Sequence, residues 1–216
     1  MNLPFLLFIS TIPCNVASII YVFAYSWKGG YCYTTNPDYP GCLEPKEYWK
    51  YNLTIHGLWP QYDTNGYPSY CSTESFDTNV PNEIGWETMT TYFPDMNYAE
   101  TSPEYDSFWE HEWDKHGTCS GLQQYDYFQQ TINLSKSYVT PEIIHKYINT
   151  TSSLNADDLR DAFGGESYVA LKCDNSNIFT EAYTCWNQTN MIQMECPSSV
   201  LSEDTCKSNY IAIYSL

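Results

Sequence analysis

The sequence predicts an α+β protein with a central antiparallel β-sheet and helices packed around it. Segments rich in the β-branched and aromatic residues of strands lie toward both ends of the chain. Segments with helical spacing and helix caps lie between them. Strands and helices that are segregated in this way are typical of α+β proteins. No repeat, low-complexity block or linker divides the 216 residues, so we expect one domain.

The first half of the chain begins with a strand and then becomes rich in turns. Residues 19–27, "IIYVFAYSW", are β-branched and aromatic and predict a buried strand. Residues 29–42 carry glycine, proline and asparagine and predict a loop. "NLTIHGLW" predicts a short strand that ends at Gly57, and residues 63–71 predict a second loop.

Helical patterns follow in the middle of the chain. The predicted helices span residues 83–92, 103–115, 125–138, 140–148 and a short stretch after Asn155. Asn155 is the expected cap of that last helix, and Gly164 with Gly165 ends it. The last strand-like segments are residues 167–173, 178–186, 191–196 and 210–214.

The N-terminus is apolar and has no charged residue before Lys28. A signal peptide, a membrane anchor, and a signal peptide joined directly to a buried strand are the alternatives. Pro4, Pro13 and several polar residues weaken the anchor, and the apolar run is as long as the core of a signal peptide. Cleavage is possible near Ala17 or after Ala24, and the residues alone do not choose between them.

Cysteines and glycosylation sequons also indicate a secretory route. Of nine cysteines, one lies inside the expected signal peptide, which leaves an even set of eight. No CxxC pair is present, which argues against a structural zinc site. The expected glycosylation sites are Asn52, Asn133, Asn149 and Asn187. We therefore expect a protein that is secreted or delivered to the lumen of a lysosome or vacuole.

The formal net charge of −17 at pH 7 argues against strong binding to nucleic acid or anionic membranes at neutral pH. Near the sequence pI of about 4.3 the net charge falls to about zero. A function on nucleic acid would therefore suit an acidic compartment.

The stretch "WEHEWDKHGTC", residues 109–119, holds the densest group of titratable side chains. On a helix Glu112 and His116 lie one turn apart on one face, and His111 with Lys115 forms a neighbouring pair. Trp109 and Trp113 form a third stripe, which points to another side. The two histidines are five residues apart, whereas a zinc-protease helix spaces them by four, so we expect no metal site. The remaining alternatives are an acid–base site and a solvated, salt-bridged helix face.

A second histidine segment, "LTIHGLWPQY", favours the acid–base site. On a strand Thr54 and His56 share one face, while Leu53 and Ile55 point to the other. We therefore expect Leu53 and Ile55 in the core and His56 in a cleft.

"TIHGLWP" at residues 54–60 and "FWEHEWDKHGTC" at 108–119 resemble the two active-site segments of the ribonuclease T2 family. "WKGGYC" at 27–32 resembles that family's W-P-G-x-Y-C, with Lys28 in place of the usual proline. "GYPSYC", "YVALKC" and "MIQMECP" resemble further family segments. The resemblance covers roughly residues 19–210 and implies the ribonuclease T2 fold. It makes Ile19–Ser26 the first core strand, so it favours a signal peptide at residues 1–18 and a catalytic domain at 19–216.

The resemblance implies a secreted acid endoribonuclease that needs no metal or other cofactor. His116 would be the general base and His56 the general acid of a transesterification that leaves 2′,3′-cyclic phosphate ends, which are then hydrolysed. His111 and Lys115 would stabilise charge on the phosphoryl oxygens. Glu112 would be catalytic, either as a protonated hydrogen-bond donor or by orienting His116.

The resemblance also implies base-binding residues and disulfides. The expected base contacts are Trp59, Gln61, Tyr67 and Phe108, and Gln61 stands where some members carry an acidic residue. The expected disulfides are Cys32–Cys42, Cys71–Cys119, Cys173–Cys206 and Cys185–Cys196. We expect an RNA substrate, no action on DNA, no stable association with membranes and a monomeric protein. A storage or recognition protein of the same fold and a metal-dependent hydrolase are the rival functions, and the retained His56, His111 and His116 argue against the first.

Overall fold

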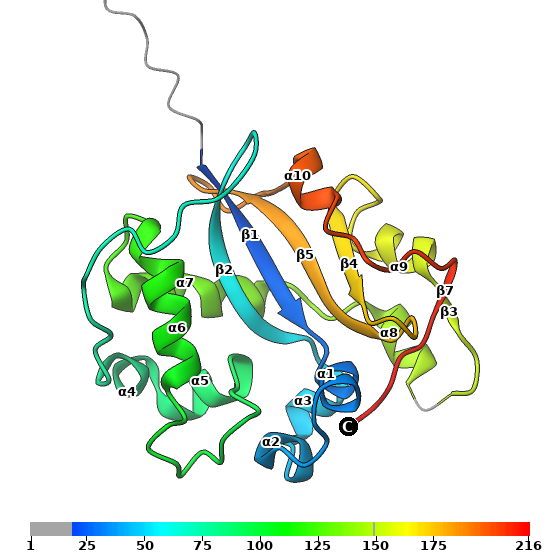
Figure 1. Cartoon of the computed structure of the whole chain (residues 1–216), viewed down its shortest axis with the longest axis horizontal. Helices are drawn as coiled ribbons and strands as arrows, with labels where there is room; N and C mark the ends of the chain where they lie inside the picture. The colour runs from blue at the N-terminus through cyan, green and yellow to red at the C-terminus, as the bar shows by residue number, and fades with distance from the viewer. Residues whose placement is uncertain (1–18, 149) are drawn as a thin grey trace, which may run out of the picture.

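The computed structural model describes residues 19–148 and 150–216 (Figure 1). The expected signal peptide at residues 1–18 and the sequon asparagine Asn149 lie outside the described residues. Within the described part of the chain, no helix is long and apolar enough to span a membrane.

The main sheet has the strand order β2-β1-β5-β4, with the short β6 paired to β5. Every pairing in it is antiparallel, as the sequence predicts. Its strands are β1 (Ile19–Ser26), β2 (Thr54–Tyr62), β4 (Val169–Cys173), β5 (Phe179–Asn187) and β6 (Gln193–Met194). A separate two-stranded sheet pairs β3 (Leu154–Asn155) with β7 (Tyr210–Ile211).

Helices surround this sheet, which confirms the predicted α+β class (Figure 1). The helices in the first part of the chain are α1 (Lys28–Thr34), α2 (Pro40–Leu43), α3 (Glu47–Tyr51), α4 (Val80–Ile84) and α5 (Trp86–Tyr92). The central ones are α6 (Ser107–Lys115), the 3-10 turn η1 (Gly117–Cys119) and α7 (Gln124–Ser137). The last are α8 (Glu142–Tyr147), α9 (Ala156–Ala162) and α10 (Ser198–Leu201).

Several predicted boundaries were wrong. The predicted loop at residues 29–42 contains α1 and α2. The single helix predicted for residues 83–92 is divided at Gly85, whose φ of +113° is outside the helical range, into α4 and α5. Helix α6 begins at Ser107, because residues 101–106 form turns. The strand expected to end at Gly57 continues to Tyr62, since it pairs with β1 along its whole length. Asn155 caps α9 as predicted, by accepting a hydrogen bond from the amide of Asp157.

The two faces of the sheet have different neighbours. Because strand residues alternate between faces, Phe23 of β1 packs into the large core with Trp109 of α6 and Phe128 of α7. Val22 faces the opposite side and packs in a smaller cluster with Val200 of α10. Figure 1 shows α7 behind the sheet, α10 beside the ends of β4 and β5, and α6 alongside the edge strand β2. A cleft opens on this second face, between residues of α6 and Val200 of α10.

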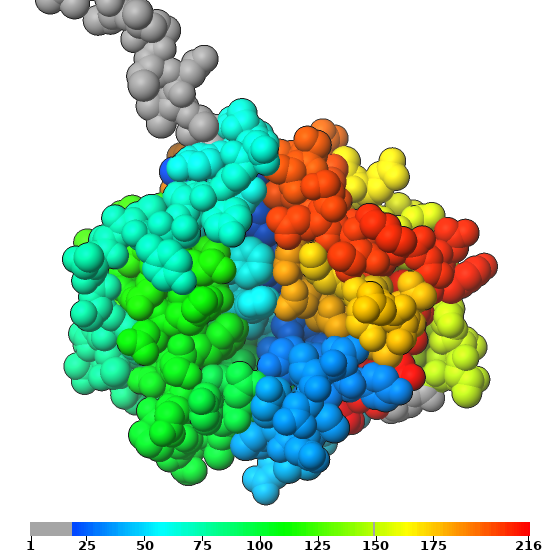
Figure 2. All heavy atoms as spheres, in the orientation of Figure 1, coloured from blue at the N-terminus to red at the C-terminus, as the bar shows by residue number. Residues whose placement is uncertain are grey.

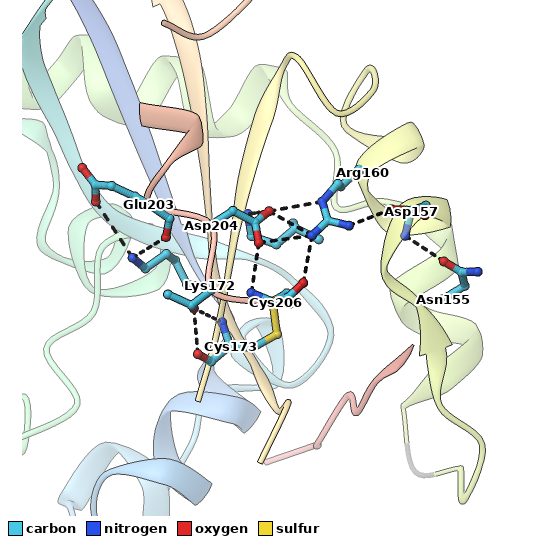
Figure 3. A network of polar contacts seen from close by, with 10 residues as sticks. Asn155, Asp157, Arg160, Lys172, Cys173, Glu203, Asp204 and Cys206 are labelled. Carbon is cyan, nitrogen blue, oxygen red and sulfur yellow. Dashed lines mark hydrogen bonds and ion pairs between the residues drawn. A yellow bond between two sulfur atoms is a disulfide. The ribbon is translucent and has the colours of Figure 1, made fainter. Parts of the chain in front are cut away.

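A polar network fastens α9 to the segment that follows α10 (Figure 3). The Arg160 guanidinium donates through Nε and Nη2 to the Asp204 carboxylate at 3.0–3.1 Å and through Nη2 to the Cys206 carbonyl. Asp204 Oδ2 also accepts the Leu171 amide of β4 at 3.1 Å. Paired guanidinium–carboxylate bonds are geometrically specific, so this network holds α10 and its neighbours against the open face of the sheet.

Four disulfides join the cysteines in the pattern that the resemblance implies: Cys32–Cys42, Cys71–Cys119, Cys173–Cys206 and Cys185–Cys196. The second links the loop of residues 66–71 to η1, at the end of α6. The third lies beside the Arg160 network (Figure 3).

Candidate active site

A cleft of about 230 Å³ opens on the sheet face between α6 and α10. Figure 2 shows this face hollowed between the green residues of α6 and the orange residues near α10, with β1 and β2 at the floor. Eight of the predicted site residues line it: His56, Trp59, Gln61, Tyr67, His111, Glu112, Lys115 and His116. Phe108 lines a neighbouring cavity of about 160 Å³, which shares His56 with the first. The part of the chain described here contains no group of three or more metal-ligating side chains.

A β-bulge in β2 brings His56 into the cleft. Tyr25 of β1 pairs with Ile55 and Ala24 pairs with Gly57, so His56 is the extra residue between them. Leu53 and Ile55 are buried in the core, as predicted. Without the bulge, the alternation of strand residues would put His56 and Trp59 on opposite faces of the sheet. With it, both rings lie in the cleft with their centroids 5.0 Å apart.

His56 lies between two carboxylates. Its Nδ1 is 2.7 Å from Glu181 Oε1 on β5, and its Nε2 is 3.9 Å from Glu112 Oε1 on α6. Burial lowers the pKa of His56, but attraction to Glu181, the hydrogen bond to Glu181 and attraction to Glu112 together outweigh burial and raise it. The same contacts hold the pKa of Glu181 below its ordinary value in spite of burial. These contacts therefore favour the protonated form of His56.

Glu112 is 1% exposed and lies at the bottom of the cleft, which it lines. Its Oε2 accepts a hydrogen bond from Trp59 Nε1 at 2.7 Å. Burial raises the pKa of this carboxyl to about 7, against the lowering effects of His56, Trp59 and Lys115. Its carboxyl oxygens contact His56 and Trp59, whereas the backbone carbonyl accepts the amide of His116.

His116 caps the C-terminus of α6 and is 5% exposed. Its ring stacks on Trp59 at 5.2 Å between centroids, and Nδ1 has no hydrogen-bond partner among the described residues. Burial, followed by repulsion from Lys115, His111 and His56, lowers its pKa to about 3. His116 is therefore neutral over most of the acidic range, in contrast to His56 on the other side of Trp59.

The two outer groups of the cleft have different charges. Lys115 is partly exposed at the end of α6, and His111 is exposed one turn earlier. Burial, then repulsion from Lys115 and His56, lowers the pKa of His111. Stabilisation of phosphoryl charge by His111, which the resemblance implies, requires its protonated form, and the lowered pKa disfavours that form near neutral pH.

The four predicted base-contact residues occupy different positions. Trp59 presents its ring to His116 and its indole N–H to Glu112, so it contacts both of these side chains. Tyr67 is 53% exposed at the rim, 6.4 Å from the His116 ring. Gln61 is buried in the wall of the cleft. Phe108 packs 5.8 Å from the His56 ring, on the side of the second cavity.

Sequence reasoning missed Glu181 and Lys28, which line the second cavity with His56, and Tyr183, which bonds Glu181. Glu181 accepts from His56 and also, through Oε2, from the Tyr183 hydroxyl at 2.7 Å. Lys28 is 4% exposed in the wall of the second cavity. Two features of the sequence could have indicated them. Glu181 is a single carboxylate within a largely apolar predicted strand, and Lys28 stands where the resemblance expects proline.

The sequence model of the ribonuclease T2 family matches residues 18–196. The chain belongs to the ribonuclease T2 family. It is an endoribonuclease of that type.

Two relatives and one solved structure indicate the range of the ribonuclease T2 family. Ribonuclease 1 of Arabidopsis thaliana is 32% identical over 190 residues, which cover 82% of this chain and 79% of that protein. A ribonuclease-like storage protein of Panax ginseng is 27% identical, over 82% of this chain and 75% of that protein. The crystal structure of human RNase T2 matches the fold with a TM-score of 0.71 at 21% identity, over 91% of this chain and 98% of that one.

Gly57 is expected to be indispensable for the geometry of this ribonuclease T2 site. A Cβ at this position would overlap Glu112 Oε2 and Trp59 Nε1, which form the hydrogen bond between β2 and α6. We expect Gly57→Ala to lower kcat/KM for RNA by about 100-fold, since displacements near 1 Å have effects of that size. Gly121→Ala is the control, because a Cβ there meets nothing within 4 Å and adds only left-handed backbone strain. Equal kcat/KM values for the two variants would contradict the expectation.

Proposed function

We propose that this protein cleaves single-stranded RNA by transesterification, with His116 as general base and His56 as general acid. The observation that carries the proposal is the opposite displacement of two histidine pKa values in one cleft. The pKa of His116 is lowered to about 3 and that of His56 is raised. Around pH 5 one imidazole is therefore a free base while the other is a proton donor, which is what a concerted proton transfer requires.

In the first step neutral His116 takes the proton of the ribose 2′-hydroxyl, and O2′ forms a bond to the adjacent phosphorus. As the P–O5′ bond breaks, His56 gives its Nε2 proton to the leaving O5′. The products are a 2′,3′-cyclic phosphate and a free 5′-hydroxyl. A water molecule then opens the ring with the roles of the two histidines reversed, and a 3′-phosphate remains. DNA has no 2′-hydroxyl and is not a substrate of this chemistry.

Glu112 acts as a hydrogen-bond donor in this proposal. Its pKa of about 7 makes it neutral in acid, so it can donate to a phosphoryl oxygen without repelling it. The alternative role, orienting the His116 ring, is disfavoured because the carboxyl contacts His56 and Trp59. Lys115 supplies positive charge at the same place, and His111 adds to it only when protonated.

Base recognition would use the aromatic rings around the cleft. Stacking on a ring is worth about 1–3 kcal/mol per base. Tyr67 is exposed at one end, while Phe108 lies in the second cavity beyond His56. We infer that the bases on the two sides of the cleaved bond lie near these two residues, with Gln61 and Trp59 in the wall of the first site.

The protein is proposed to work in an acidic, oxidising compartment reached through the secretory pathway. The four disulfides support this route, as do the exposed sequon residues Asn133 and Asn187. Asn52 is half-buried and donates to the Tyr48 carbonyl, outside the residues that line the cleft. We propose residues 1–18 as a signal peptide and residues 19–216 as one catalytic domain that acts as a monomer, without stable membrane association.

The direct test is incubation of the purified protein with matched RNA and DNA oligonucleotides at pH 5, in excess chelator. We expect cleavage of RNA alone. Cleavage of DNA, or loss of RNA cleavage in chelator, would contradict the proposal and favour a metal-dependent hydrolase. Binding of RNA without cleavage would favour a storage or recognition role.

The Cys71–Cys119 disulfide is expected to matter more for activity than Cys32–Cys42. It ties the loop of Tyr67 to η1 beside His116, and the Tyr70 amide also bonds the Lys115 carbonyl. The sequence separations are 48 and 10 residues, so chain entropy alone makes the first worth about 1.4 kcal/mol more. We therefore expect the variant with Cys71 and Cys119 replaced by serine to have a lower Tm than the variant with Cys32 and Cys42 replaced. It should also have a lower kcat/KM when both are measured well below either Tm. Equal kcat/KM values would contradict this ranking.

A further inference from the structure

A buried group of charges lies behind His56, on the side away from the cleft. Glu181 is the nearest, with Oε1 2.7 Å from His56 Nδ1 and Oε2 2.7 Å from the Tyr183 hydroxyl. Both carboxylate oxygens are thus engaged, and the side chain is 18% exposed. The His56 ring is held from behind, so Nε2 is the nitrogen left to face the cleft and Glu112.

Lys28 brings a positive charge to the same place. It is the first residue of α1 and is 4% exposed. Its Nζ lies 5.2 Å from the Tyr31 ring centroid, and it lines the second cavity together with His56, Glu181 and Asp95. Among the described residues no carboxylate comes within 4.0 Å of Nζ, so the ammonium acts on its neighbours through space and is not locked in an ion pair.

A buried ammonium without a direct partner is costly, and a structural role does not require it. Proline would suit the first position of α1, and the resemblance to the family expects it there. Burial lowers the pKa of Lys28 to about 8, while Glu181 and Asp95 counteract burial and keep it charged in acid. Lys28 in turn lowers the pKa of His56, opposite to Glu181.

We propose that Glu181 is a positioning residue that holds His56 protonated and correctly oriented, and that buried Lys28 weakens this hold so that His56 can release its proton. The inference deepens the proposed function and rests on His56 being the general acid. A carboxylate alone would stabilise the imidazolium so strongly that transfer to O5′ becomes less favourable. The nearby positive charge reduces that stabilisation. No proton passes to Glu181, because Nδ1–H stays hydrogen-bonded while Nε2 gives up its proton.

Titratable groups surround His56 on several elements, and they shift its pKa in different directions. The titratable groups that surround it are Glu181 and Tyr183 on β5, Glu112 and His111 on α6, His116 at the C-terminal cap of α6, Lys28 on α1 and, beyond Lys28, Asp95. Glu181 and Glu112 raise the pKa of His56, and Lys28 lowers it. The proposal therefore predicts that removing Glu181 and removing Lys28 shift the His56 pKa in opposite directions.

The test is an NMR titration of His56 in the free protein, which has only four histidines. We expect Glu181→Gln to lower the His56 pKa by about one unit and Lys28→Met to raise it by a similar amount. Lys28→Pro, which suits the start of α1, should shift it in the same direction as Lys28→Met. Lys207→Met removes an exposed lysine remote from the cavity and should leave the titration unchanged.

Kinetics supply the second readout. Glu181→Gln should lower kcat for RNA by at least about 10-fold with little change in KM, since it acts through the general acid. Shifts of the two variants in the same direction, or no shift in either, would overturn the proposal. The titration needs no substrate, so it tests how Glu181 and Lys28 set the protonation of His56 whether or not the protein cleaves RNA. Failure of the unaltered protein to cleave RNA would instead contradict the proposed function.

Discussion

His56→Ala is expected to lower kcat for RNA by about 10²–10⁴-fold, the range for loss of a general acid or base. The same variant should cleave a uridine 3′-(p-nitrophenyl phosphate) nearly as fast as the unaltered protein. The nitrophenolate leaves without a proton, so a general acid contributes little to that reaction. His116→Ala should lose activity on both substrates, because O2′ must be deprotonated in each case.

This contrast tests the roles directly. It follows from the raised pKa of His56, held by Glu181, and the pKa of about 3 for His116. His145→Ala is the matched control, because His145 lies on α8 and hydrogen-bonds the Tyr51 carbonyl, outside both cavities. If the activated substrate rescues His116→Ala and not His56→Ala, the two roles are reversed.

The second large effect is the pH dependence of kcat/KM. His116 has a pKa of about 3 and must be neutral, so activity should rise as the pH increases through this value. Glu112 has a pKa of about 7 and must be protonated, and His56, with its raised pKa, must also keep its proton. Activity should therefore fall as the pH increases through about 7. We expect a maximum between about pH 4 and 6.

The net charge of the protein acts in the same direction. The −17 charge at pH 7 repels RNA, and it declines toward the pI of about 4.3. To separate charge from catalysis, kcat/KM for a dinucleotide is compared with that for RNA at constant ionic strength. The dinucleotide should keep both limbs of the profile, since they arise from the site. A maximum above pH 7.5 for the dinucleotide would be inconsistent with the assigned protonation states.

The sequence predicted the arrangement of side chains around α6 well because that pattern is local. The spacing of Glu112 and His116, with Trp109 and Trp113 on another side, follows from helix geometry, and both tryptophans are buried in the core as expected. The antiparallel sheet followed from strand-like segments at both ends. The signal in each case lies within a few residues of the feature.

Features that depend on distant segments could not be predicted from residues alone. The bulge at His56 exists because the nine residues of β2 pair with only eight residues of β1, and it decides that His56 and Trp59 share a face. The hydrogen bond from His56 to Glu181 joins residues 125 positions apart. The burial of Lys28 depends on how α1 packs against β5, whereas its sequence neighbours indicate only turns. The raised pKa of His56 results from the contact with Glu181 across this distance, which burial and Lys28 oppose.

The most direct test of the two-histidine transesterification is a time course of product ends. The substrate is a DNA oligonucleotide with a single internal ribonucleotide, incubated at pH 5 in excess chelator and followed by mass spectrometry. We expect cleavage only on the 3′ side of the ribonucleotide, with a 2′,3′-cyclic phosphate and a 5′-hydroxyl appearing first and the 3′-phosphate later. A 5′-phosphate with a 3′-hydroxyl as the first products would contradict the mechanism, because water would then have attacked in place of O2′.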